Sequence, residues 1–149
     1  MKVSIALVCL FIISCQHMPK SHAFRLKPGA DLQKEIQTYV EQHGIEAGWI
    51  SGAVGSLEQY QIRFANQPNG SGGSGHFEIL SLTGTVSKNG SHVHLGISDS
   101  TGHTLGGHLL PGNIVYTTAE IVILEEPGLV FTREKDGTTP WEELQIRKK

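Results

Sequence analysis

Cysteine is scarce in this sequence of 149 residues: Cys9 and Cys15 are its only two, and both lie near its start. A folded domain that begins after them can form no internal disulfide. It also offers no thiolate, the ligand on which most structural zinc sites depend. A domain of this size can bury enough apolar surface to fold without disulfides, so their absence does not argue against export from the cell.

The sequence has no excess of positive charge either. It holds 12 Lys and Arg against 14 Asp and Glu, a net charge of −2, and without residues 1–14 the net charge is −3. Its one compact basic run is Arg147-Lys148-Lys149. An acidic domain attracts nucleic acid poorly, because binding to the phosphate backbone depends on clustered Lys and Arg. We therefore do not expect nucleic acid among its partners.

No hydrophobic run is long enough to span a bilayer. The longest, residues 3–13, follows Lys2 and is followed at once by the polar residues 14–21. A basic start, a short apolar run and a polar break are typical of a secretory signal peptide. The sequence therefore predicts a signal peptide over residues 1–14 and a single folded domain over residues 22–149.

Two cleavage sites compete at the end of this signal. Ile12-Ile13-Ser14-Cys15 resembles a bacterial lipoprotein signal, in which Cys15 becomes the lipidated first residue. Ser21-His22-Ala23 offers instead the small-x-small pattern of ordinary signal peptidase, with cleavage after Ala23. We favour the first, which predicts an exported protein that is periplasmic or anchored to a membrane by lipid. The second predicts a secreted protein.

The pattern of apolar residues predicts an α+β fold, a mostly antiparallel β-sheet packed by one main α-helix. Asp31 is a suitable N-cap, after which apolar residues recur at helical spacing until Gly44. Short apolar or alternating runs separated by turns predict the strands. These runs are residues 22–26, 49–54, 57–65, 77–86, 92–98, 104–109 and 114–124, with a final hairpin of residues 130–133 and 144–147.

Residues 67–75 have the composition of a flexible linker, because four glycines are interleaved with serine. A phosphate-binding loop would need Gly-Lys-Ser/Thr at the start of a helix, and here a strand follows instead. We therefore predict a mobile surface loop.

His92 and His94 lie two residues apart in a predicted strand, so both side chains emerge on the same face. Whether His108 joins them depends on the turn between the two strands. A two-residue loop would send its side chain to the opposite face. A three-residue loop with Gly102 in a left-handed conformation pairs His94 with His108, and Gly102 is well suited to that turn.

Three imidazoles on one face would form a metal site with an open coordination position, as in catalytic rather than structural zinc sites. Zinc is the default ion where thiolates are absent, and other divalent metals that accept imidazole are alternatives. Gly106 and Gly107 indicate close approach of a ligand or another backbone beside His108. The alternative interpretation is that the histidines are ordinary polar residues on the solvated face of a sheet.

Four motifs follow one another between about residues 22 and 126. They are Gly75-His76-Phe77-Glu78-Ile79-Leu80, His92-Val93-His94, Gly106-Gly107-His108-Leu109 and Thr118-Ala119-Glu120-Ile121. Together they resemble the plants-and-prokaryotes conserved (PPC) domain family. The first is close to the Gly-Arg-Phe-Glu-Ile-Leu motif through which plant members interact with partner proteins. His76 replaces its arginine, which puts that interaction in doubt here.

The resemblance implies an antiparallel sheet packed by one helix, and assembly as a homotrimer. It also implies that His92, His94 and His108 correspond to the metal-binding histidines of prokaryotic members. The fold is similar to that of acetolactate decarboxylase and of a zinc-dependent ester hydrolase. That similarity is an analogy, since a fold alone does not fix a function.

Three functions remain open, and with them whether the protein is an enzyme. The first is an exported metalloprotein, a hydrolase or lyase of small molecules, with Glu78 or Glu120 as candidate proton-transfer groups unless these glutamates are structural. The second is DNA binding, the role of plant relatives, although the sequence has no Gly-Arg-Pro core of an AT-hook. The third is a non-enzymatic trimeric binding module with a structural metal.

Overall fold

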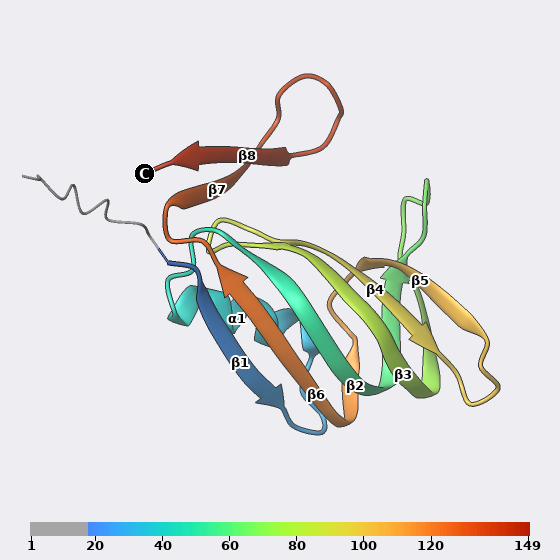
Figure 1. The fold of residues 1–149 in the computed structure, drawn as a ribbon. Helices are drawn as coiled ribbons and strands as arrows, with labels where there is room; N and C mark the ends of the chain where they lie inside the picture. Colours follow the sequence, from blue (N-terminus) through green and yellow to red (C-terminus); the bar gives the residue numbers. More distant parts are fainter. Residues whose placement is uncertain (1–17) are drawn as a thin grey trace, which may run out of the picture.

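The computed structural model describes residues 18–149 (Figure 1). The predicted signal peptide over residues 1–14 and the lipidation candidate Cys15 lie outside the described residues. Within the described part, no helix is long and apolar enough to cross a membrane. The elements in order are β1 (Lys20–Leu26), α1 (Leu32–Gln42), β2 (Gly48–Arg63), β3 (Ser71–Val86), β4 (His92–Ser98), β5 (Thr104–Leu109), β6 (Ile114–Glu125), β7 (Leu129–Glu134) and β8 (Glu143–Lys148).

Six strands form one antiparallel sheet in the order β1-β6-β2-β3-β4-β5, and β7 pairs with β8 in a separate hairpin. The last strand, β5, also pairs with the end of β2, where Ile62 meets Leu109 and Arg63 meets His108. The sheet therefore curls until its edge strand meets one of its central strands (Figure 1). The α+β fold predicted from the sequence is confirmed.

One helix covers one face of this sheet (Figure 1). Asp31 caps α1, and its side chain accepts hydrogen bonds from two backbone amides of the first turn at 3.2 and 3.3 Å. Leu32, Ile36 and Val40 recur at helical spacing and join the same buried cluster as the apolar strand residues. Burial against α1 thus decides which face of each strand is left for solvent.

The structure joins the predicted strands 49–54 and 57–65 into one strand, β2. Its register with β6 shifts along its length, and Gly55, with a φ of 150°, lies at one of these shifts. A Cβ on Gly55 would lie 2.1 Å from the carbonyl oxygen of Thr118. Gly55, which in the sequence separates two predicted strands, is therefore a point of close approach between β2 and β6.

The predicted mobile loop over residues 67–75 is wrong for its second half. Residues 71–75 begin β3, and residues 71–74 pair with residues 59–62 of β2. A Cβ on Gly72 would lie 2.9 Å from the backbone carbonyl oxygen of Tyr60. A glycine that gives this segment the composition of a linker thus allows a close approach to the neighbouring strand.

The predicted C-terminal hairpin is present as β7 and β8, and Phe131 anchors it to the rest of the protein. The Phe131 side chain is buried, and its backbone amide donates a hydrogen bond to the carbonyl oxygen of Glu46 at 2.9 Å. Its own carbonyl oxygen accepts hydrogen bonds from Ser87 Oγ at 3.2 Å and Asn89 Nδ2 at 2.9 Å. The hairpin is therefore fixed beside the start of β4.

Candidate metal centre

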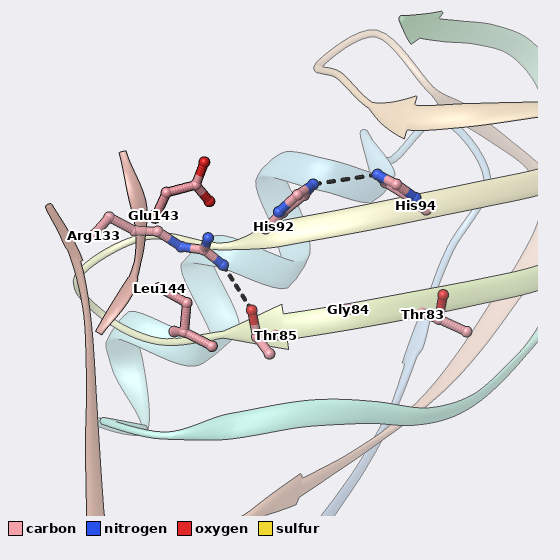
Figure 2. Close-up of a pocket in the computed structure, with 8 residues that line it drawn as sticks. All are labelled: Thr83, Gly84, Thr85, His92, His94, Arg133, Glu143 and Leu144. Atoms are coloured by element: carbon pink, nitrogen blue, oxygen red, sulfur yellow. Dashed lines mark hydrogen bonds between the residues drawn. The ribbon is translucent and has the colours of Figure 1, made fainter. Parts of the chain in front are cut away.

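His92 and His94 stand on the face of β4 that points away from the core. Val93, which lies between them, and Leu95, which follows, belong to the buried apolar cluster. Because side chains alternate along a strand, burial of these two residues directs both imidazoles outward. Figure 2 shows the two histidines side by side along β4.

The turn from β4 to β5 has the form expected from the sequence. Gly102 has a φ of 83° and donates its amide hydrogen to the carbonyl oxygen of Asp99 at 3.0 Å. The amide of Asp99 donates to the carbonyl oxygen of His103, also at 3.0 Å. These bonds close a three-residue loop and place His94 directly opposite His108. The predicted register is confirmed.

The paired glycines before His108 are required by two neighbouring strands. A Cβ on Gly106 would lie 2.8 Å from the carbonyl oxygen of Leu95, and a Cβ on Gly107 would lie 2.6 Å from that of Arg63. Of the two explanations that the sequence left open, close approach of another backbone is the one the structure supports. This close packing holds β5 between β4 and β2, and with it His108.

The three imidazoles converge closely enough to share one ion. One nitrogen of each lies within 4.8 Å of the others, and Nε2 of His92 lies 3.2 Å from Nε2 of His94 (Figure 2). Two nitrogens bound to a tetrahedral zinc ion are roughly 3.3 Å apart. His92 and His94 therefore have the spacing of two ligands, and side-chain rotation can close the remaining gap of at most roughly 1.5 Å to His108.

His108 also carries a polar atom without a partner. Its Nδ1 is buried and forms no hydrogen bond within residues 18–149. Such an atom destabilises a protein unless water or a ligand satisfies it. An unpartnered ring nitrogen within a cluster of three imidazoles fits a group that binds a metal ion.

The electrostatic environment favours the neutral form of His92 and His108. Loss of solvent, together with the charges of His92 and Arg63, lowers the pKa of His108 to about 4. Loss of solvent and the charge of Arg133 also lower the pKa of His92, while Glu143 opposes that shift. A metal ion binds the neutral form of imidazole, so at neutral pH both rings are in the state that can bind one.

The C-terminal hairpin, β7 and β8, lies on the other side of the hollow from the histidine strand β4. Arg133 of β7 and Glu143 of β8 reach toward His92 (Figure 2). The Arg133 side chain is held in place because its Nη2 donates a hydrogen bond to Thr85 Oγ1 at 2.7 Å. Leu144 adds an apolar contact to the same hollow. The imidazoles therefore lie between a strand surface and a charged hairpin.

A cavity of about 490 Å³ lies between the histidines and the hairpin. Its side chains include His92 and His108 from the sheet, Arg63 from the end of β2, and Arg133 and Trp141 from the hairpin. The guanidinium carbon of Arg63 lies 5.8 Å from the centre of the Trp141 ring. A volume of this size suits a small organic molecule.

Neither glutamate suggested by the sequence lies at this cavity. Glu78 pairs with Ser98 at the far end of β4 from His92, and it lines a separate hollow. Glu120 pairs with Arg25 of β1, at the opposite edge of the sheet. The carboxylates at this cavity are Glu142 and Glu143, and the charge of Glu143 acts on His92. Sequence reasoning missed them because the position of the hairpin relative to the sheet leaves no local signal.

The predicted interaction motif, residues 75–80, lies in β3 and divides between the two faces of the sheet. Phe77 and Ile79 are buried in the core, whereas His76 and Leu80 are exposed. The two buried residues thus contribute to stability. A role in binding another protein, which would fall to the exposed residues, stays a prediction.

Comparison with known proteins assigns a family. The family model of the Plants and Prokaryotes Conserved (PCC) domain matches residues 14–127. The chain is 42% identical over 128 residues to the bifunctional protein GlmU of Synechococcus sp. (strain JA-2-3B'a(2-13)), a match that covers 86% of this chain and 20% of that protein. The chain therefore spans about a fifth of the length of this relative.

Solved structures resemble the chain over most of its length. A hypothetical protein from Salmonella enterica is 39% identical with a TM-score of 0.86, over 89% of this chain and 96% of that one. A metal-containing protein from Archaeoglobus fulgidus is 30% identical with a TM-score of 0.72, over 85% of this chain and 93% of that one. A Bacteroides thetaiotaomicron protein proposed to bind DNA is 22% identical with a TM-score of 0.74, over 84% of this chain and 91% of that one. At this level of identity the likeness bears on the fold alone.

Proposed function

The chain belongs to the family of the Plants and Prokaryotes Conserved domain, and we propose that His92, His94 and His108 bind a divalent metal ion of the zinc type. The observation that carries this proposal is their spacing, with one nitrogen of each ring within 4.8 Å of the others. A relative that is 30% identical is a metal-containing protein, which supports the same conclusion.

The donor set fits such an ion. Three neutral imidazoles without a thiolate are typical of zinc sites that keep one position for water or substrate. A divalent ion held there would polarise a carbonyl group or lower the pKa of a water molecule. The protein would thus be equipped for hydrolysis or for lyase chemistry on a small molecule.

Glu143 is the side chain best placed to move a proton in such a reaction. It lines the same cavity as His92 and His108, and its charge acts on His92. Thr139 Oγ1 donates a hydrogen bond to Oε1 of Glu143 at 2.5 Å, which orients the carboxylate. We therefore assign Glu143, rather than Glu78 or Glu120, the role of general acid or base.

Metal analysis of the purified protein tests the proposed site. We expect about one divalent ion per chain in the natural sequence and almost none in His94→Ala. His103→Ala is the matched control, because His103 lies in the exposed turn outside the cluster. The proposal is contradicted if His94→Ala holds as much metal as the natural protein, or if the natural protein holds none.

We also propose that the protein is exported and assembles as a homotrimer, as its signal-like start and family resemblance suggest. Exposed apolar side chains on β2, β3 and β6, such as Val54, Leu80 and Tyr116, support an assembly. Light scattering should give the mass of three chains, and a mass of one chain contradicts the trimer. Metabolic labelling with a fatty acid that is lost in Cys15→Ser would establish the lipid anchor.

DNA binding ranks below the metal site. The net charge of −2 opposes it, because binding to the phosphate backbone depends on clustered Lys and Arg. Cell fractionation separates the two proposals, since a protein found in the cytoplasm would favour DNA binding and one found outside it would exclude that role.

A further inference from the structure

Two guanidinium groups face the cavity beside the three imidazoles, one from the end of β2 and one from the hairpin. We propose that Arg63 and Arg133 bind the carboxylate of a small organic acid, which is the class of substrate or ligand for this site. The inference rests on the proposed function, because the metal site gives the bound molecule a reactive neighbour. It goes further by naming what the molecule must carry.

Neither arginine forms a close ion pair within the described part of the chain, although the charge of Glu143 acts on Arg133. Within residues 18–149, the ion pairs closer than 4.0 Å involve Arg147, lysines and His22, and none includes Arg63 or Arg133. Both side chains are half-buried, so they have lost part of their hydration. A half-buried guanidinium without a carboxylate partner is suited to bind an anion.

Both arginines are also held in position. Nη2 of Arg133 donates to Thr85 Oγ1 at 2.7 Å (Figure 2), which leaves the other donors of that guanidinium free for a ligand. Arg63 is paired through its backbone with His108, and its guanidinium stacks near Trp141. An anion held between them would therefore lie next to His108 without any large movement of the chain.

The cavity favours a monoanionic carboxylate over a phosphate. A guanidinium can bind either group through two hydrogen bonds. Glu142 and Glu143 line the same cavity and repel a doubly charged phosphate more strongly than a singly charged carboxylate. Trp141 and Leu144 offer apolar surface beside the charged groups, which suits the carbon skeleton of an organic acid.

Ligand-observed NMR on the zinc-loaded full chain tests this inference. The probes are 2-hydroxy acids from lactate to 3-phenyllactate, each compared with its neutral amide, and inorganic phosphate. We expect at least one acid to bind about tenfold more tightly than its amide and than phosphate. Arg63→Gln and Arg133→Gln should each weaken that acid about tenfold. Arg25→Gln is the control, because Arg25 on β1 is exposed and forms no ion pair within residues 18–149, and it should leave the affinity within about twofold.

Metal content and thermal unfolding are measured on every sample. If zinc is present in full but the acids bind no better than their amides, or bind equally to all variants, the inference is overturned and the metal site stands. If phosphate binds more tightly than every acid, the carboxylate assignment is overturned. If the natural protein holds no zinc, the proposed function fails and this inference fails with it. A variant that unfolds is replaced by Arg63→Lys or Arg133→Lys, which keeps the charge but loses the planar donors and should also weaken the acid.

Discussion

The candidate site has two walls that differ in how the chain builds them. The wall formed by β4 and β5 comes from one continuous stretch, in which a three-residue turn sets His108 opposite His94. The wall formed by the hairpin comes from residues about 40 positions further along the chain. Hydrogen bonds from Ser87 and Asn89 to the carbonyl oxygen of Phe131 hold it in place. The first wall supplies the metal ligands and the second supplies charge.

One wall of the site thus depends on local geometry and the other on tertiary packing. Strand alternation and turn length determine the face on which each histidine emerges, so lengthening or shortening the turn by one residue should remove His108 from the first wall. The second wall depends on how a hairpin with its own two-stranded sheet packs against the start of β4. Weakening that packing should leave the metal ligands in place.

Deletion of Thr101 should cause the largest loss of bound metal. It shortens the turn to two residues, which reverses the parity of the pairing and sends His108 to the opposite face of the sheet. We expect metal content to fall to the level of His94→Ala, as measured by mass spectrometry of the metal. Thr101→Ala, which keeps the length of the turn, is the control and should retain the metal. A deletion variant that keeps one ion per chain would show that the register does not determine the site.

Phe131→Ala should affect the hairpin wall alone. The buried ring holds the hairpin to the body of the protein, and its loss should reduce the free energy of unfolding by about 3 kcal/mol. Ile146→Ala is a matched control, because Ile146 lies directly opposite Phe131 in the hairpin but is 59% exposed. Urea unfolding measures the stability.

In Phe131→Ala, the affinity for the organic acid should fall while one metal ion per chain remains. Loss of metal and acid together would show that the metal ligands depend on the packing of the hairpin, so that the two walls form a single unit.

The sequence predicted the strand wall because its determinants are close together in the chain. The alternation around His92 and the suitability of Gly102 for a left-handed turn are both visible in a few residues. The hairpin itself could also be predicted, but not where Arg133 and Glu143 would point. That depends on hydrogen bonds such as the one from Asn89 to Phe131, between segments about 40 residues apart.

Composition was misleading where it was used alone. Residues 71–75 have the glycine and serine content of a linker, yet they lie in β3, where Gly72 closely approaches the backbone carbonyl of Tyr60. Glu78 and Glu120 belong to motifs in the sequence, but the sheet places both far from the histidines. Identity of a motif does not determine the distance of its side chains from a site.

The smallest expected effect is a pH dependence of the stability of the metal-free protein. The pKa of folded His108 is about 4, below its usual value of 6.5, so the unfolded chain binds more protons between these values. The stabilising contribution of neutral His108 is therefore complete above about pH 6.5 and is lost as the pH falls toward 4. Solvent around the partly exposed ring makes this effect modest.

The midpoint of urea unfolding, measured in chelator from pH 7.5 to 4.5, should thus fall less in His108→Gln than in the natural protein. His103→Gln is the control and should behave as the natural protein does, because His103 is exposed outside the cluster. Identical pH dependence in the natural protein and His108→Gln would contradict the assignment of a neutral, partly desolvated imidazole.

The most direct test of the three-histidine metal centre is a crystal structure of the zinc-loaded protein, with diffraction recorded on both sides of the zinc absorption edge. The account predicts one strong anomalous peak about 2.0–2.1 Å from a ring nitrogen of each of His92, His94 and His108. Ordered histidines with no peak between them, or a zinc ion bound to other residues, would contradict it.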